Sequence, residues 1–205
     1  GIRTPSLLSY AKSAVNCGVT TATDLFATFN PESLAAYEEV SLMPDYALRL
    51  MPAMNTIEQP VDEGLALMKK AMSMNNDRLH HRLCKVMTDG SIQGFTARLK
   101  WPGYYNGKPN GLWNMDPAQL AELVMDYHKA GMHLHIHTNG DEASEVMLDA
   151  VEAAQEAHYR PDHRHTLQHC QMADASQFRR MKNLGMCVNL FANHLHYWGD
   201  QHAGI

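Results

Sequence analysis

The stretch of sequence that decides the fold is His133-Leu-His-Ile-His-Thr-Asn-Gly-Asp141, in which three histidines alternate with two apolar residues before a turn. In an extended chain the imidazoles share one face and the apolar residues the other, which predicts a β-strand. The Asn-Gly pair predicts a turn, and Asp141 is placed to cap a following helix. Active sites of β/α proteins lie where a strand ends, which favours His137 as a site residue. Alternating histidines are equally typical of satisfied core or edge positions.

Helical and extended patterns alternate along the chain, which predicts an α/β protein. The spacing of apolar residues predicts helices over residues 7–15, 31–40, 61–72, 116–130, 143–154 and 174–184, and strands over residues 19–24, 46–53, 83–88, 133–137, 164–171 and 186–190. The short joints between them indicate a parallel sheet with right-handed crossovers. No glycine-rich phosphate loop follows a strand, and candidate ligands end several strands, so we expect a (β/α)8 TIM barrel rather than a doubly wound sheet.

Composition narrows the class of protein. The 205 residues are 45% hydrophobic and 19% charged, which is typical of a globular protein, and the net charge of −5 argues against a nucleic-acid partner. No apolar run reaches the roughly 18 residues of a membrane span. The four cysteines are far apart, so we expect reduced, mostly buried thiols and a cytoplasmic location. Most of the 13 histidines lie after residue 127, which indicates metal or acid/base chemistry, or a pH-sensitive surface.

Lys85 is an unusual residue for the strand predicted over residues 83–88. It shares a face with Met87 and Asp89, and if the other face packs on helices, its ammonium points into the sheet or barrel. A buried ammonium must pair, lose its proton or be chemically changed, because an unpaired one costs several kcal/mol. A salt bridge to Asp89 or to Asp24, itself a modest site candidate at a strand end, is the ordinary alternative.

Two aromatic segments are candidates for binding substrate. Residues 89–115 show no periodicity and contain Trp101 among several aromatic residues, so this long loop either holds a planar or apolar substrate or packs on itself. After the last strand, residues 191–200 carry His194 and His196, and we expect a loop that forms a substrate wall or an ordinary aromatic cluster.

Three motifs fall at predicted strand ends in a fixed order. They are Lys-x-x-x-Asp-Gly-Ser from Lys85, His-x-x-Gly-Asp-x-Ala from His137, and Arg-His-x-x-x-His-x-Gln ending at Gln171, which contains His169. Two imidazoles with one further nitrogen or oxygen donor suit zinc or a similar transition metal. The set resembles the amidohydrolase superfamily, most of all its branch of YtcJ-type proteins and N-substituted formamide deformylases.

The resemblance implies a metal-dependent hydrolase that cleaves a C–N bond, amide-like but non-peptide, with a metal-activated hydroxide. It implies that Lys85 is carbamylated (that is, carboxylated) and bridges two divalent ions, or else lies beside one. It also implies that His137 and His169 are metal ligands, and zinc is the expected metal. Asp89, Trp101 and His194 are expected to contact a small-molecule substrate. Asp141 is expected to cap the helix and to contact the metal ligands rather than the metal itself.

The family's first-strand His-x-His pair and eighth-strand aspartate, its general base, have no counterpart in the sequence. We therefore expect residues 1–205 to be part of one TIM-barrel domain, covering about strands 2 to 7, whose open edges favour a homo-oligomer. One alternative is a non-catalytic barrel remnant or binding module that has lost its metal. Another is a loose metal-handling surface made by His80, His81, His158 and His163. We expect His128 and His158, which lie at the C-terminal ends of helices, to be solvated or to compensate the helix dipole.

Overall fold

The computed structural model describes residues 2–204. The chain divides into two compact units, with the boundary between Lys85 and Val86 inside strand β4. The prediction of a single domain over residues 1–205 stays a prediction. No helix within residues 2–204 has both the length and the apolar character needed to cross a membrane.

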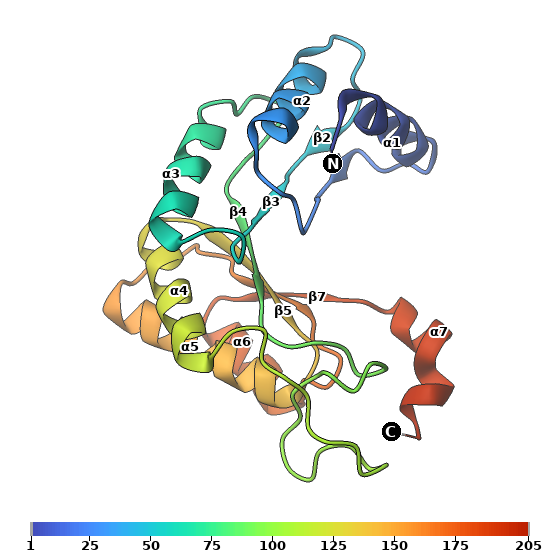
Figure 1. The fold of residues 1–205 in the computed structure, drawn as a ribbon, viewed down its shortest axis with the longest axis vertical. Helices are drawn as coiled ribbons and strands as arrows, with labels where there is room; N and C mark the ends of the chain where they lie inside the picture. The colour runs from blue at the N-terminus through green and yellow to red at the C-terminus, as the bar shows by residue number, and fades with distance from the viewer. Residues whose placement is uncertain (1, 205) are drawn as a thin grey trace. The chain divides into compact units, whose positions relative to one another are not determined.

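The first unit contains helices and short parallel strands, coloured from blue to green in Figure 1. The elements are α1 (Thr4–Asn16), β1 (Thr21–Ala22), α2 (Pro31–Leu42), β2 (Arg49–Leu50), β3 (Ala53–Asn55), α3 (Val61–Met72) and the start of β4 (Leu83–Met87). Strand β1 pairs with β2, and β3 pairs with the start of β4, both in parallel. Helices α1 and α2 pack together, and their core includes Leu7, Tyr37 and Leu48.

The strand predicted over residues 46–53 is wrong, because two short strands replace it. Strand β2 ends at Leu50 and β3 begins at Ala53, with Pro52 between them. Proline has no backbone N–H and cannot donate to a sheet ladder, so it interrupts the strand. As a result β2 pairs with β1, whereas β3 pairs with β4.

The second unit alternates helices with the strands of a parallel sheet. Its elements are the end of β4, α4 (Pro117–Lys129), β5 (His133–Thr138), α5 (Asp141–Ala157), β6 (Thr166–His169), α6 (Ala175–Asn183), β7 (Cys187–Leu190) and α7 (Asn193–His202). The strand order along the larger sheet is β3-β4-β5-β6-β7. Leu134 and Ile136 on β5 are fully buried while its histidines are half-buried, as the alternation predicted. Asp116 caps α4 and Asp174 caps α6.

Two other local predictions are wrong. Helix α5 has Gly140 rather than Asp141 at its N-cap, and Asp141 is its first helical residue. Residues 193–202 form helix α7 and not a loop. This segment contains no proline and no β-branched residue, and its one glycine, Gly199, does not prevent a helix. The alternation of His194 and His196 therefore does not mark a strand end.

A cluster of histidines is buried near the start of β6. Leu134 N–H donates to Nδ1 of His165 (3.1 Å), so the neutral His165 ring carries its proton on Nε2 and donates it to Nδ1 of His128 (2.9 Å). His128 in turn donates from Nε2 to the His158 carbonyl (2.7 Å). Nδ1 of His163 accepts the backbone N–H of His165 (3.0 Å), and Nε2 of His163 donates to the backbone carbonyl of Leu184 (2.7 Å).

The observed burial of side chains corrects three expectations from the sequence. His128 is fully buried rather than solvated, because its ring completes the chain of hydrogen bonds to His165. His81 and His163 are also buried, so the loose metal-handling surface that would include them is wrong. Of the four cysteines only Cys84 and Cys170 are buried.

Candidate metal site at the strand ends

His137 and His169 come together at the ends of neighbouring parallel strands. On β5 and β6 Thr138 is opposite His169, which places the two histidines next to each other. Their ring centroids are 4.8 Å apart and the rings are inclined by 70°. Both side chains are half-buried. The sheet therefore brings two of the three predicted metal ligands into one place.

The orientation of the His137 ring is set by a backbone carbonyl. Its Nε2 lies 2.9 Å from Gly90 O, and a carbonyl only accepts, so the neutral ring holds its proton on Nε2 and its lone pair on Nδ1. The Asn139 side-chain amide donates to the same carbonyl over 2.7 Å. A histidine that binds a metal almost always donates its other ring N–H to a carbonyl or carboxylate. His137 has the hydrogen bond that is typical of such a ligand.

His169 sits in an unusual backbone conformation. Its φ is +72° and that of Cys170 is +47°, in the left-handed region that non-glycine residues rarely adopt. The Cys170 N–H donates to Gln168 O (3.0 Å) and to Thr138 O (2.9 Å), which closes a tight three-residue turn around His169. Such strain costs on the order of 1–3 kcal/mol and is concentrated at functional sites. The strand end is therefore shaped to present this imidazole.

His194 extends the pair into a row of three imidazoles. It lies on α7, and its ring is 6.2 Å from the His169 ring and nearly parallel to it. Phe191 packs edge-on against it at 4.6 Å. Burial, together with nearby His202, lowers the pKa of His194. Within residues 2–204 its buried Nδ1 has no hydrogen-bond partner, so this atom is available to a ligand in the row.

Asp89 lies next to His137 and is fully buried. Its carboxylate accepts the backbone N–H groups of Arg98 (3.0 Å), Asn139 (3.0 Å) and Gly140 (2.9 Å). One oxygen is 3.7 Å from Nε2 of His137. Burial raises the pKa of Asp89 to about 6, although the amide hydrogen bonds act in the opposite direction. These contacts favour a supporting role over the predicted contact with substrate.

Trp101 and Asp141 belong to the long loop and its attachment. The Trp101 side chain is 94% exposed, whereas Tyr104 is buried against Phe95, at 5.4 Å, so part of the loop packs on itself. The Asp141 carboxylate accepts the Lys100 N–H (2.9 Å) and thereby ties the loop to the start of α5. Their predicted roles, substrate contact and support of the ligands, stay predictions.

Lys85 lies on β4 and is 4% exposed. Burial lowers the pKa of its ammonium to about 8. The carboxylate of Asp24, one of its two expected salt-bridge partners, instead accepts the Phe26 N–H (3.2 Å) and the Tyr37 hydroxyl (3.1 Å). Lys85 belongs to the first unit and the histidine row to the second. Its place beside His137 and His169 therefore stays a prediction.

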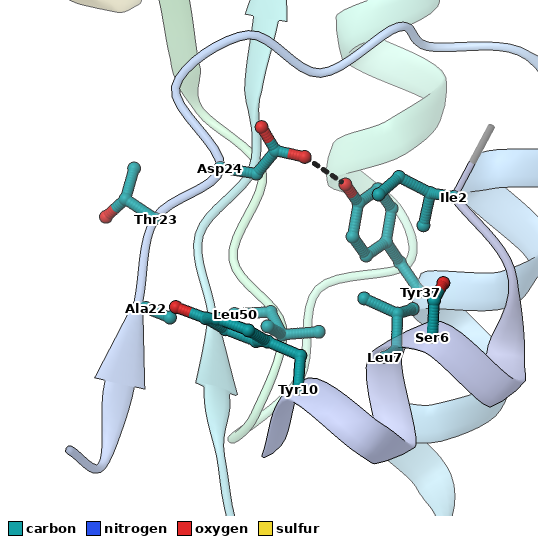
Figure 2. Close-up of a pocket in the computed structure, with 9 residues that line it drawn as sticks. All are labelled: Ile2, Ser6, Leu7, Tyr10, Ala22, Thr23, Asp24, Tyr37 and Leu50. Atoms are coloured by element: carbon teal, nitrogen blue, oxygen red, sulfur yellow. Dashed lines mark hydrogen bonds between the residues drawn. The ribbon is translucent and has the colours of Figure 1, made fainter. Parts of the chain in front are cut away.

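The first unit has a cavity of its own, shown in Figure 2. Its volume is about 330 Å³, and its apolar walls include Leu7 and Tyr10 of α1, Ala22 of β1 and Leu50 of β2. The Asp24–Tyr37 hydrogen bond forms one end of it (Figure 2). Burial of the Tyr37 hydroxyl, and to a lesser extent the nearby Asp24 carboxylate, raises the pKa of Tyr37. Among the described residues that line the cavity there is no imidazole or thiol, so the histidine row is the better candidate for metal chemistry.

The donors in the row suit a metal only in part. Two imidazoles provide half of a four-ligand zinc shell. Within the described residues 2–204, no three His, Cys, Asp or Glu side chains are grouped so as to hold an ion. A metal bound by His137 and His169 therefore needs a donor of another kind, such as Lys85, or one from outside these residues.

Residues 8–204 match the model of the amidohydrolase family. The chain belongs to this family. It is 27% identical over 201 residues to Protein LONG AFTER FAR-RED 3 of Arabidopsis thaliana, covering 94% of this chain and 34% of the relative. It is 30% identical over 106 residues to the putative amidohydrolase YtcJ of Bacillus subtilis (strain 168), covering 52% of this chain and 20% of YtcJ. The amidohydrolase chain thus spans about a third or less of these relatives.

Solved structures share the fold of this amidohydrolase chain. An uncharacterized metal-dependent hydrolase of Pyrococcus horikoshii OT3 has a TM-score of 0.71 at 18% identity, over 95% of this chain and 38% of that one. Its counterpart from Pyrococcus furiosus has a TM-score of 0.70 at 19% identity, over 92% of this chain and 37% of that one. With the parallel β/α order, this confirms the predicted fold class, a partial TIM barrel.

Proposed function

We propose that this chain contributes metal ligands to a hydrolase that cleaves the C–N bond of an amide-like, non-peptide small molecule. The observation that carries the proposal is the His137–His169 pair, with rings 4.8 Å apart and the His137 proton directed at Gly90 O. Membership of the amidohydrolase family supports hydrolysis. The description of the two Pyrococcus proteins as metal-dependent hydrolases supports a metal.

We propose Lys85 as the third ligand, after carbamylation. The neutral amine forms a bond with the carbon of CO₂ and releases a proton, so a buried cation becomes an anionic oxygen donor. Only a neutral amine reacts in this way, and a pKa of about 8 leaves a much larger neutral fraction near pH 7.5 than an exposed lysine has. This change would also remove the cost of burying the ammonium.

A divalent cation such as zinc, when bound, supplies Lewis acidity and makes water a stronger nucleophile at neutral pH. In the hydrolysis, water adds to the carbonyl carbon, the C–N bond breaks and the amine leaves with a proton. His137 and His169 hold the cation. His194, whose pKa is lowered, stays neutral at pH 7 and can accept a hydrogen bond from the substrate. The group that carries the proton to the amine is expected outside this chain, and Trp101 is a proposed substrate contact on the exposed loop.

Metal content tests the proposal. Protein loaded with zinc and dialysed is expected to retain one or two ions per chain by elemental analysis. His137→Ala and His169→Ala should lose this zinc, because removing a ligand costs more than the roughly 10–100-fold in affinity lost with a supporting partner. Lys85→Ala should weaken zinc binding if its carbamate is a ligand. His196→Ala is the matched control, because that imidazole is exposed on α7.

The result also separates the proposal from its alternative. If the wild-type chain retains no zinc, or if zinc is held equally by the wild type and His137→Ala, the proposal fails. The chain is then a non-catalytic barrel remnant or a binding module.

A further inference from the structure

We infer that Asp89 is a positioning residue, which fixes the ring of His137 through the Asn139–Gly140 turn and the carbonyl of Gly90. The inference deepens the proposed function and rests on it only in so far as His137 is a metal ligand. Asp89 is fully buried, so it does not touch substrate or solvent and acts through its neighbours.

The Asp89 carboxylate joins two segments that are far apart in sequence. It accepts the N–H of Arg98 from the long loop and the N–H groups of Asn139 and Gly140 from the turn after β5. Gly140 is the N-cap of α5 and has no side chain to cap the helix itself. Asp89 therefore provides the negative charge that the start of α5 favours, from a different part of the chain.

The same contacts determine which way His137 faces. With its backbone N–H held by Asp89, Asn139 turns its side-chain amide onto Gly90 O (2.7 Å). Gly90 is next to Asp89 in the chain, and its carbonyl accepts the Nε2 proton of His137 (2.9 Å). The Gly90 carbonyl keeps the His137 proton on Nε2, and hence the lone pair on Nδ1. Asp89 fixes this carbonyl both as its neighbour in the chain and through the Asn139 side chain.

The packing around Gly140 leaves this arrangement little freedom. A Cβ on Gly140 would lie 1.7 Å from Arg98 O, so the backbones of the loop and the turn are in direct contact. The Arg98 guanidinium holds Glu142 of α5 through two hydrogen bonds, of 3.0 and 3.1 Å. A loop bound so closely to the turn transmits the position of Asp89 to β5, on which His137 lies.

The test compares Asp89→Ala and Asp89→Asn with Asp174→Asn. Asp174 is a matched control, because it also accepts two backbone N–H groups, those of Ser176 (2.7 Å) and Gln177 (2.9 Å), at the start of α6. Ring ¹⁵N shifts of His137 report its tautomer in the metal-free chain, and zinc titration reports affinity. The histidine signals are assigned with a His137→Gln variant.

We expect the wild type and Asp174→Asn to show His137 with its proton on Nε2. Asp89→Ala should give a mixture of tautomers and zinc binding weakened about 10–100-fold. Asp89→Asn, which keeps one acceptor oxygen, should lie between them. An unchanged Nε2 tautomer in Asp89→Ala overturns the inference. If Asp89→Ala does not fold, an unchanged tautomer in Asp89→Asn overturns it. Because the tautomer is measured without metal, this result is independent of whether the chain binds zinc.

Discussion

The buried histidine cluster should make the chain sensitive to acid, and His165 gives the magnitude. Its ring is fully buried. Burial is the main reason why its pKa lies far below the ordinary value of 6.5, and the neighbouring His163 and His128 lower the pKa further. Below pH 6.5 His165 therefore binds a proton in the unfolded chain but stays neutral in the folded chain. Stability is fully present above pH 6.5 and is lost as the pH falls, by about 1.4 kcal/mol per pH unit for this residue.

Between pH 6.5 and 4.5 His165 alone should cost about 2.3 kcal/mol, a large part of the roughly 5–15 kcal/mol that stabilises a typical domain. His128 and His163, whose pKa values burial also lowers, add to the loss in the same direction. Arg160, which donates to the His128 carbonyl (2.8 Å), opposes their protonation further by its positive charge.

The assay is urea unfolding followed by far-UV circular dichroism at pH 7.5, 6.5, 5.5 and 4.5. His165→Gln should be less stable at pH 7.5, because hydrogen bonds are lost, but its free energy of unfolding should fall less steeply with acid, by about 1.4 kcal/mol per pH unit. The control His196→Gln, altered at an exposed ring, should run parallel to the wild type. Equal slopes for His165→Gln and the wild type would refute the reasoning.

Three further predictions follow from buried positions. Gly140→Ala should destabilise the protein by about 3 kcal/mol or more in urea unfolding, because its Cβ would lie 1.7 Å from Arg98 O. Lys85→Met should stabilise the metal-free protein at pH 7 by up to about 3 kcal/mol, and wild-type stability should rise between pH 8 and 10.5, because burial lowers the pKa of Lys85 to about 8. Iodoacetamide at pH 7.5 should label exposed Cys187 before Cys170, whose pKa burial raises to about 11, as mass spectrometry can check.

Each of these predictions has an internal comparison. Gly199→Ala is the control for Gly140→Ala, because a Cβ at position 199 meets nothing within 4 Å. Since Gly199 lies in helix α7, its replacement by alanine should stabilise the protein slightly. For Lys85→Met, a loss of stability at pH 7 would show that the ammonium is compensated. Labelling of Cys170 as fast as Cys187 in the folded protein would show that this strand end opens readily.

The elements with strong local patterns were predictable from the sequence. Strand β5 follows from its alternation, and helix α4 from its apolar stripe and the aspartate and proline at its start. The pairing of His137 with His169 also followed, because consecutive parallel strands end at the same edge of a sheet.

Contacts between distant residues could not be predicted in this way. His128 and His165 are 37 residues apart, and Asp89 and Gly140 are 51 apart, so no local spacing reveals either pair. The supporting roles of Asn139 and the Gly90 carbonyl were missed for the same reason. The Asp-Gly and Asn-Gly pairs that follow β4 and β5 were the available signal, although they predict turns rather than partners.

The attachment of the long loop also matters for engineering. Residues Arg98 and Lys100 secure its base to α5, while the hydrogen bonds of residues 101–108 within the described chain stay inside the loop. The exposed residues of the tip can therefore be exchanged, provided that Arg98, Gly140 and the buried Tyr104 are kept. A library confined to the exposed residues among 101–108 would vary this surface without changing the residues that attach the loop to α5.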